Sequence, residues 1–200
     1  MLCIGCGVIL TVPQHSFTTA AYARTLSEIA RTKESMKNIQ FKIFPIIGLI
    51  LYVPFHVLEE ALGNFPLWMH QHYYGLPQPL SYSHWLINNG IFLLVLLIGL
   101  TFYLKNEKKY LYLGIGIIVW LFTNAMEHIV FSIKDVQLSP GFFTAILFLL
   151  LVFFSFFKLN ENKVLQWPII GKSILAGLSY WIISFVFIIL IGNTLIKIFP

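Results

Sequence analysis

Charged residues are scarce in this sequence of 200 residues, in which Asp, Glu, Lys and Arg together account for 10% and hydrophobic residues for 58%. A typical soluble domain has about 25% charged residues, because its surface must face water. The shortage therefore excludes an ordinary soluble protein and indicates an integral membrane protein, with the lipid bilayer as its first partner. The net charge of +5 comes from basic residues placed between apolar runs, so we relate them to membrane topology and expect no nucleic-acid partner.

Cysteine is also rare, with only Cys3 and Cys6 near the N-terminus. Their C-x-x-C spacing suits half of a structural zinc site, but such a site needs four ligands and no second pair follows. We attach no function to this pair.

Five long apolar segments follow one another from residue 41 onward. A helix of 20 residues is about 30 Å long, which matches the hydrocarbon core of a bilayer. The sequence therefore predicts an all-α fold, an integral membrane bundle of about five transmembrane helices. The predicted helices are residues 41–60, 84–104, 110–133, 142–157 and 173–196. Residues 61–83, rich in Gly, Pro, His and Tyr, are expected to form a loop that caps the bundle.

Residues 1–40 are the least apolar part, and we predict an amphipathic or disordered arm here, before a transmembrane domain of residues 41–200. Met36 stands directly before the first apolar run, where it would make an ordinary start, so residues 1–35 are predicted to be dispensable. Lys and Arg number 5, 0, 3, 1, 3 and 1 in the successive non-spanning segments. By the positive-inside rule, this alternation predicts a multi-pass protein of the cell membrane with a cytoplasmic N-terminus.

The few ionisable residues near the membrane segments gather at one level. The first segment ends with His56, Glu59 and Glu60, and the third ends with Glu127 and His128, both at the predicted outer side. Asparagines of the second and third segments, Asn88, Asn89 and Asn124, lie at the same depth. Ionisable residues are costly inside a membrane and usually face the bundle interior with partners, so we predict one shared, buried site.

Helical spacing supports a common site. His56, Glu59 and Glu60 are related as i, i+3 and i+4, which places the three side chains on one helix face. Pro54 cannot donate an N–H to the carbonyl of Ile50, so a kink is expected just before His56.

Two histidines and three glutamates from two helices are suitable ligands for zinc or for a dinuclear iron or manganese centre. We therefore predict a divalent metal with His56, Glu59, Glu60, Glu127 and His128 as candidate ligands. Glu127 and Glu60 are also the candidate catalytic carboxylates, acting as ligand or general base. The remaining membrane-proximal histidines, His70, His72 and His84, are interpreted as loop or interfacial residues.

With these motifs the chain resembles the HXXEE-domain family, integral membrane proteins with an H-x-x-E-E motif, a further histidine and a Y-x-P-G motif, and no established function. His56-Val57-Leu58-Glu59-Glu60 matches the first motif in full, and His128 is the candidate for the further histidine. Leu138-Ser139-Pro140-Gly141 keeps the Pro-Gly but has leucine in place of the tyrosine. The resemblance implies one coherent site and names no reaction.

Three functions remain open from the sequence. The first is a metal-dependent intramembrane enzyme that acts on a lipid or another membrane substrate. The second is a cation or proton-coupled transporter, although a carrier needs a polar path across the membrane and the inner helix ends carry no second cluster. The third is a non-catalytic structural or accessory subunit, in which the polar cluster holds two helices together.

Overall fold

A computed structural model of the chain describes residues 22, 24–28, 41–72, 80–192 and 194. The chain divides into two units, Met1–Lys37 and Asn38–Pro200, and the second contains the helices considered below. Within the predicted arm of residues 1–40, only 22 and 24–28 are described, and they are helical. The alternative start at Met36 lies outside the described residues.

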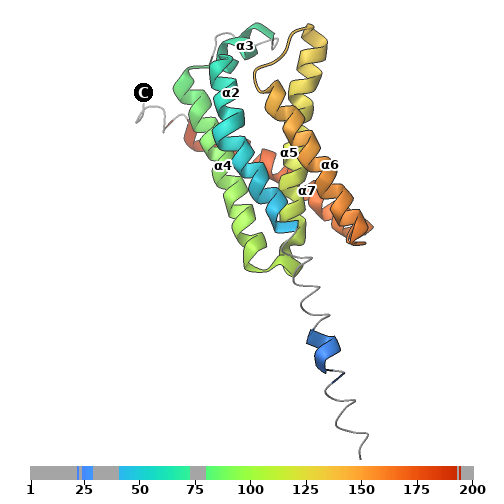
Figure 1. Ribbon diagram of the computed structural model, residues 1–200. Helices are drawn as coiled ribbons and strands as arrows, with labels where there is room; N and C mark the ends of the chain where they lie inside the picture. The colour runs from blue at the N-terminus through green and yellow to red at the C-terminus, as the bar shows by residue number, and fades with distance from the viewer. Residues whose placement is uncertain (1–21, 23, 29–40, 73–79, 193, 195–200) are drawn as a thin grey trace, which may run out of the picture. The chain divides into compact units, whose positions relative to one another are not determined.

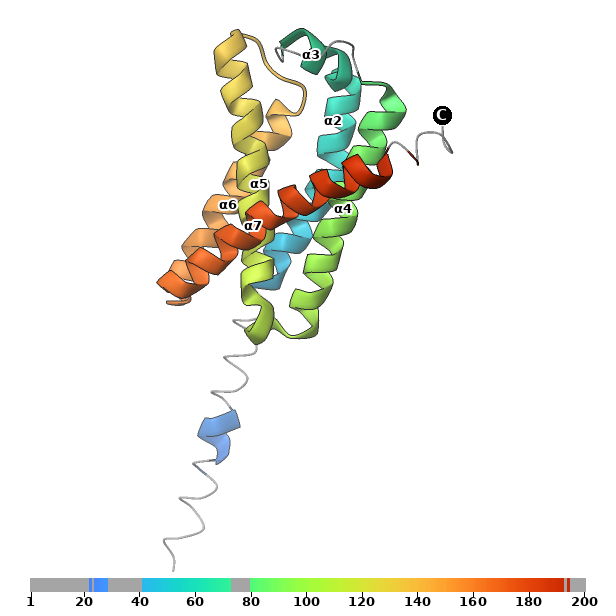
Figure 2. The same cartoon turned by 180° about the vertical axis from the view of Figure 1, so that it is seen from behind.

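Helices make up the second unit, and no strand occurs among its described residues, which confirms the predicted all-α fold (Figures 1 and 2). Five of its helices are long and apolar enough to span a membrane, as predicted. These spans are Phe41–Leu62, α4 (Tyr82–Lys105), α5 (Glu107–Asp135), α6 (Phe142–Glu161) and Trp167–Ile191. The last contains α7 (Trp167–Phe187) and most of the π-helix η2 (Ile188–Gly192). The chain is therefore suited to a multi-pass membrane location, and its orientation stays a prediction.

The fifth span begins earlier than we expected. Its first residue is Trp167, six residues before the predicted start at Ser173. The sequence analysis treated Trp167 and Pro168 as part of a connection, but Pro168 lies in the first turn of the helix. Proline is well suited to that position, because the first turn has no intrahelical use for its missing N–H.

Helix α5 is the centre of the bundle and packs against α4, α6 and α7. Its apolar window is 56% buried, compared with 22–33% for the other spans. Close contact with α7 depends on small residues, since a Cβ added to Gly116 would lie 2.8 Å from the Cβ of Ala176. The buried α5 thus provides a fixed support for side chains that point into the bundle.

The first span changes its winding around Pro54. Residues Leu51–His56 form the π-helix η1, which continues as α2 (Val57–Leu62). We predicted an irregularity here from the missing N–H of Pro54, and it takes the form of a widened turn that ends at His56.

The end of the bundle next to α2 is covered by the short helix α3 (Phe65–His72), which lies across it in Figure 1. Trp68 stacks on His72 with ring centroids 4.8 Å apart and meets Phe131 of α5 edge-on at 5.9 Å. His72 Nδ1 also lies 3.2 Å from Asp135 Oδ2 at the end of α5. His70 and His72, which we expected in a loop, are therefore helical, because the aromatic side chains of this segment pack onto α5.

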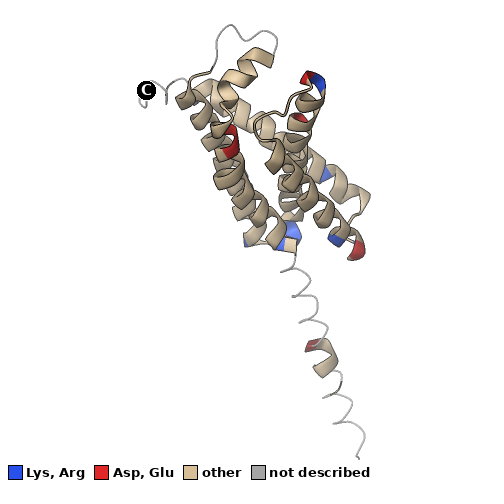
Figure 3. Ribbon diagram, turned by 45° about the horizontal axis from the view of Figure 1, so that its top comes forward, with Lys and Arg blue, Asp and Glu red and all other residues tan. Residues whose placement is uncertain are grey.

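Charge is concentrated at the helix ends, with long uncharged stretches between them (Figure 3). Acidic residues interrupt the uncharged ribbon of the first span, where Glu60 is buried. A buried carboxylate needs partners, and the partners of Glu60 define the candidate site.

Candidate metal site

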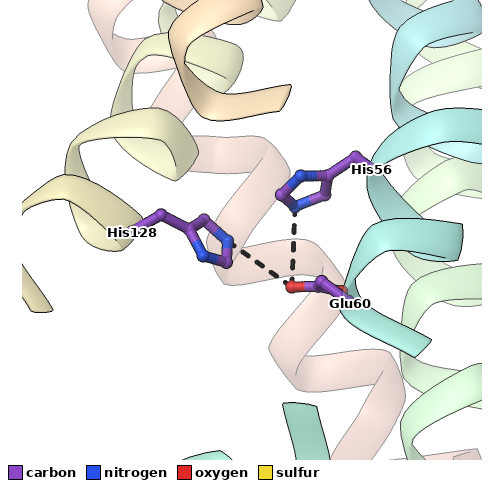
Figure 4. Close-up of side chains that lie close together, drawn as sticks. All are labelled: His56, Glu60 and His128. Carbon is purple, nitrogen blue, oxygen red and sulfur yellow. Dashed lines mark ion pairs between the residues drawn. The ribbon is translucent and has the colours of Figure 1, made fainter. Parts of the chain in front are cut away.

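Three side chains from two spans meet at one oxygen atom. His56 Nε2 lies 3.5 Å from Glu60 Oε1, and His128 Nε2 lies 3.4 Å from the same oxygen (Figure 4). One ligand atom from each residue can be chosen so that all three lie within 4.8 Å of one another. The exposed fractions of the three side chains are 0%, 6% and 3% in the order His56, Glu60, His128. The first span and α5 thus bring together a buried group that we call the His56–Glu60–His128 cluster.

A chain of hydrogen bonds holds the His56 ring. Its Nδ1 lies 2.7 Å from Thr144 Oγ1. The only proton of the Thr144 hydroxyl has two acceptors within reach, Glu59 Oε2 at 2.7 Å and the Gly141 carbonyl at 3.0 Å. When the Thr144 proton goes to one of these two oxygens, Thr144 accepts from His56 Nδ1, and a neutral His56 then has its lone pair on Nε2.

His128 is held in the same way by two serines. Its Nδ1 lies 3.2 Å from Ser139 Oγ, and the Ser139 hydroxyl donates to the carbonyl of His128 at 3.0 Å. Ser132 Oγ accepts the main-chain N–H of Ser139 at 2.9 Å and donates to the same carbonyl at 2.7 Å. These bonds fix the turn after α5 against the ring, and a neutral His128 that donates from Nδ1 to Ser139 presents a lone pair of Nε2 to Glu60.

When both rings are neutral and carry their protons on Nδ1, the cluster presents three acceptor atoms to one another. His56 Nε2 has no hydrogen-bond partner among the described residues. Buried polar atoms without a partner are costly, and lone pairs that converge at 3.4–3.5 Å repel one another unless a positive charge lies between them. In protein metal sites, the second ring nitrogen of a histidine ligand is usually hydrogen-bonded in this manner. The donor set thus fits a cation.

Glu59, predicted as a ligand, lies outside this group. Its Oε1 accepts the main-chain N–H of Phe143 at 2.9 Å, and its Oε2 accepts that of Thr144 at 2.8 Å. Both oxygens thus serve the N-terminus of α6, where free N–H groups and the helix dipole favour a carboxylate. Adjacent residues of a helix point about 100° apart, so Glu60 can face α5 while Glu59 faces α6.

Gly141 closes the site from the α6 side. Its φ of 95° is in the left-handed region, which favours glycine. A Cβ at this position would lie 2.7 Å from His128 Cε1 and 2.8 Å from His56 Cε1. Leu138, which stands where the resemblance noted in the sequence implies a tyrosine, is 54% exposed. The retained Pro-Gly half of that motif is therefore the half that contacts the cluster.

Glu127 has a different position from the three cluster residues. Together with Glu60 and His128, it lines a cavity of about 220 Å³ whose wall is formed by residues of the first span, α3, α4, α5, α7 and η2. The asparagines noted in the sequence, Asn88, Asn89 and Asn124, line the same cavity. A carboxylate is thus available on the cavity wall beside the cluster.

The comparison with protein families places these residues in a known group. A family model described as "Protein of unknown function with HXXEE motif" matches residues 47–157, a segment that includes His56, Glu60, His128 and Gly141. The chain belongs to this family. Neither a curated protein nor a solved structure matches it. In this HXXEE protein, the histidine and the second glutamate of the motif enter the cluster, and the first glutamate caps α6.

Three residues of the site were missed by the sequence analysis: Thr144, Ser139 and Ser132. Hydroxyl residues are frequent in apolar helices, where they often bond to their own backbone, so they give no pattern that separates a site residue from a structural one. The Pro-Gly pair was the only local signal near them.

Proposed function

We propose that this HXXEE protein is a membrane-embedded metalloprotein in which His56, Glu60 and His128 hold one divalent cation. The observation that carries the proposal is the convergence of two buried imidazole nitrogens on a buried carboxylate oxygen, at 3.5 and 3.4 Å, with His56 Nε2 unpaired among the described residues. Two histidines and one carboxylate are the ligands of many catalytic zinc sites, which keep a further position open. The same set also suits iron(II).

A single ion is favoured over a dinuclear centre. Two metal ions in a helical bundle are usually bridged and bound by several carboxylates. Glu60 is the only carboxylate in the cluster, because both oxygens of Glu59 accept hydrogen bonds from α6.

We further propose an enzymatic role on a lipid or another membrane substrate. A divalent cation held here would act as a Lewis acid toward an ester or amide carbonyl. Glu127 would take a proton from the attacking group, since its side chain lines the cavity next to Glu60 and His128. Thr144 and Ser139 would keep both imidazoles in the tautomer that presents Nε2.

Elemental analysis of the purified full chain tests the metal site. We expect about one zinc or iron per chain, lost in His56→Ala and His128→Ala and retained in the matched control His84→Ala. His84 lies at the start of α4 and bonds to Ser81, away from the cluster. Circular dichroism establishes that each variant remains helical. A wild-type protein that takes up no zinc, iron or manganese would overturn the proposal and leave a proton as the shared cation of a structural cluster.

A further inference from the structure

The residues that line the cavity beside the cluster restrict the kinds of ligand it can bind. Sixteen of the described residues line it, of which seven are aromatic, three are asparagines and none is lysine or arginine. Glu127 on the cavity wall would repel a phosphate or carboxylate head group, and no basic side chain is present there to pair with one. The cavity is thus unsuited to an anionic lipid head.

One face of α5 presents a donor and an acceptor that have no partner. Trp120, Asn124 and His128 follow one another at i, i+4 and i+8, and all three line the cavity. The indole N–H of Trp120 and the carboxamide oxygen of Asn124 lack a hydrogen-bond partner among the described residues. Both residues are buried, Trp120 at 1% and Asn124 at 8% exposure. Such groups are normally satisfied. Neither atom is itself accessible, so a small shift of the two side chains, which line the cavity, would let a ligand there accept from one and donate to the other.

The unpaired N–H of Trp120 and oxygen of Asn124 determine which uncharged or cationic ligands can form both hydrogen bonds. A quaternary ammonium group suits aromatic walls, but it can neither accept from Trp120 nor donate to Asn124. A primary ammonium group donates only. An amide, or an ester with a neighbouring hydroxyl, offers a carbonyl and an N–H or O–H within a few bonds.

The wall formed by α7 and η2 suits an acyl chain. Trp181, Phe185 and Ile188 are apolar or aromatic, and Phe185 is 51% exposed while it lines the cavity. A chain that passes Phe185 would reach the outer surface of the bundle, which faces lipid in a membrane span.

We propose that this cavity binds an uncharged acyl lipid whose head group carries a carbonyl together with an N–H or O–H, such as an N-acyl amide. Trp120, about two helical turns before His128, donates to the head group, and Asn124, about one turn before His128, accepts from it. The inference deepens the proposed function and rests on it for the reaction at the carbonyl, whereas binding in the cavity is measured separately from the metal.

The test uses quenching of tryptophan fluorescence in the full chain in phosphatidylcholine nanodiscs. Three probes share one brominated chain: 11-bromoundecanoyl ethanolamide, 11-bromoundecanoate and 11-bromoundecyltrimethylammonium. Because Trp85, Trp120 and Trp181 line the cavity, occupation should quench them in a saturable manner. We expect the ethanolamide to saturate at a membrane fraction at least tenfold lower than the charged probes. A preference for either charged probe, or no saturable quenching, would overturn the inference.

Matched variants test the two hydrogen bonds. Asn124→Leu and Trp120→Phe should each raise the half-saturating fraction about five- to tenfold, the effect of losing one buried hydrogen bond. The controls Asn160→Leu and Trp167→Phe, both at exposed positions away from the cavity, should stay within about twofold of wild type. If both cavity variants bind the ethanolamide as tightly as the controls do, Trp120 and Asn124 do not bond to the head group. If Asn124→Leu does not fold, Trp120→Phe alone tests this.

Metal content distinguishes the two proposals. A wild-type chain that holds metal but does not bind the ethanolamide saturably refutes the cavity inference alone. Saturable binding by a chain that takes up no metal refutes the metal proposal alone.

Discussion

Glu59 and Thr144, 85 positions apart in the sequence, are joined by two hydrogen bonds to the same carboxylate oxygen, from the main-chain N–H at 2.8 Å and from the hydroxyl at 2.7 Å. Thr144 Oγ1 is also hydrogen-bonded to His56 Nδ1, at 2.7 Å. The two adjacent glutamates of the motif thus have separate tasks, since Glu60 faces the cluster and Glu59 orients a cluster residue through Thr144.

The first prediction tests the separate roles of Glu59 and Glu60. Glu59→Ala should weaken metal affinity about 10- to 100-fold without abolishing it, as expected for a residue behind the ligands. It should also lower the free energy of unfolding by about 1–2 kcal/mol, because it removes the cap of α6. Chelator competition and thermal unfolding in detergent measure the two effects. Glu161→Ala, which breaks an exposed pair with Lys158, is the control and should change neither by much. Complete loss of metal in Glu59→Ala would restore Glu59 as a ligand.

The second prediction isolates the hydroxyl of Thr144. Thr144→Val keeps the shape of the side chain but removes the acceptor for His56 Nδ1, so metal affinity should fall about 10- to 100-fold. Thr144→Ser retains the hydroxyl and should bind within about threefold of wild type. Chelator competition on both proteins provides the comparison, and equal affinities for the valine and serine variants would show that the hydroxyl does not orient His56.

The third prediction concerns Gly141. Gly141→Ala places a methyl group within 2.7–2.8 Å of both imidazoles and imposes a side chain on a φ of 95°. We expect loss of metal and a decrease in stability of about 1–3 kcal/mol. Gly171→Ala is the matched control, since no atom lies within 4 Å of its added Cβ and alanine favours the helix. A Gly141→Ala protein that binds metal like Gly171→Ala would refute the tight packing of this turn on the cluster.

Some residues of the site could be predicted from the sequence and others could not, because periodicity specifies only local geometry. The i, i+4 spacing of His56 and Glu60 and the apolar length of each span depend only on local geometry, so the spans and two cluster residues follow from the sequence. Periodicity does not tell which neighbouring helix each face meets. Glu59 and Glu60 could therefore not be separated, because that distinction requires knowing that α6 lies on one side and α5 on the other. The roles of Thr144 and Ser139 could not be predicted for the same reason, since they too require knowing which helices are neighbours.

The fourth prediction addresses orientation. The lysine alternation places the N-terminus in the cytoplasm, with the turn at Asn106 inside and α3 outside. In a background of Cys3→Ser and Cys6→Ser, an impermeant maleimide added to intact cells should label Gln71→Cys but not Asn106→Cys, whereas both should react after permeabilisation. Both positions are exposed, so access to the thiol is not limited by packing. The reverse labelling pattern would show the opposite topology, with α3 in the cytoplasm and Asn106 outside.

The last prediction separates Glu127 from the ligands. Glu60 provides the oxygen atom on which both imidazoles converge, whereas Glu127 lines the cavity outside the three-residue cluster. Glu60→Gln should therefore abolish stoichiometric metal, because it removes the negative charge at the centre of the cluster. Glu127→Gln has nearly the same shape and should keep about one metal per chain, with an affinity within about threefold of wild type. Elemental analysis and chelator competition distinguish the two variants. Loss of metal in Glu127→Gln would assign this carboxylate to the ion as a fourth ligand, and the proton acceptor of the proposed reaction would then have to be another group on the cavity wall.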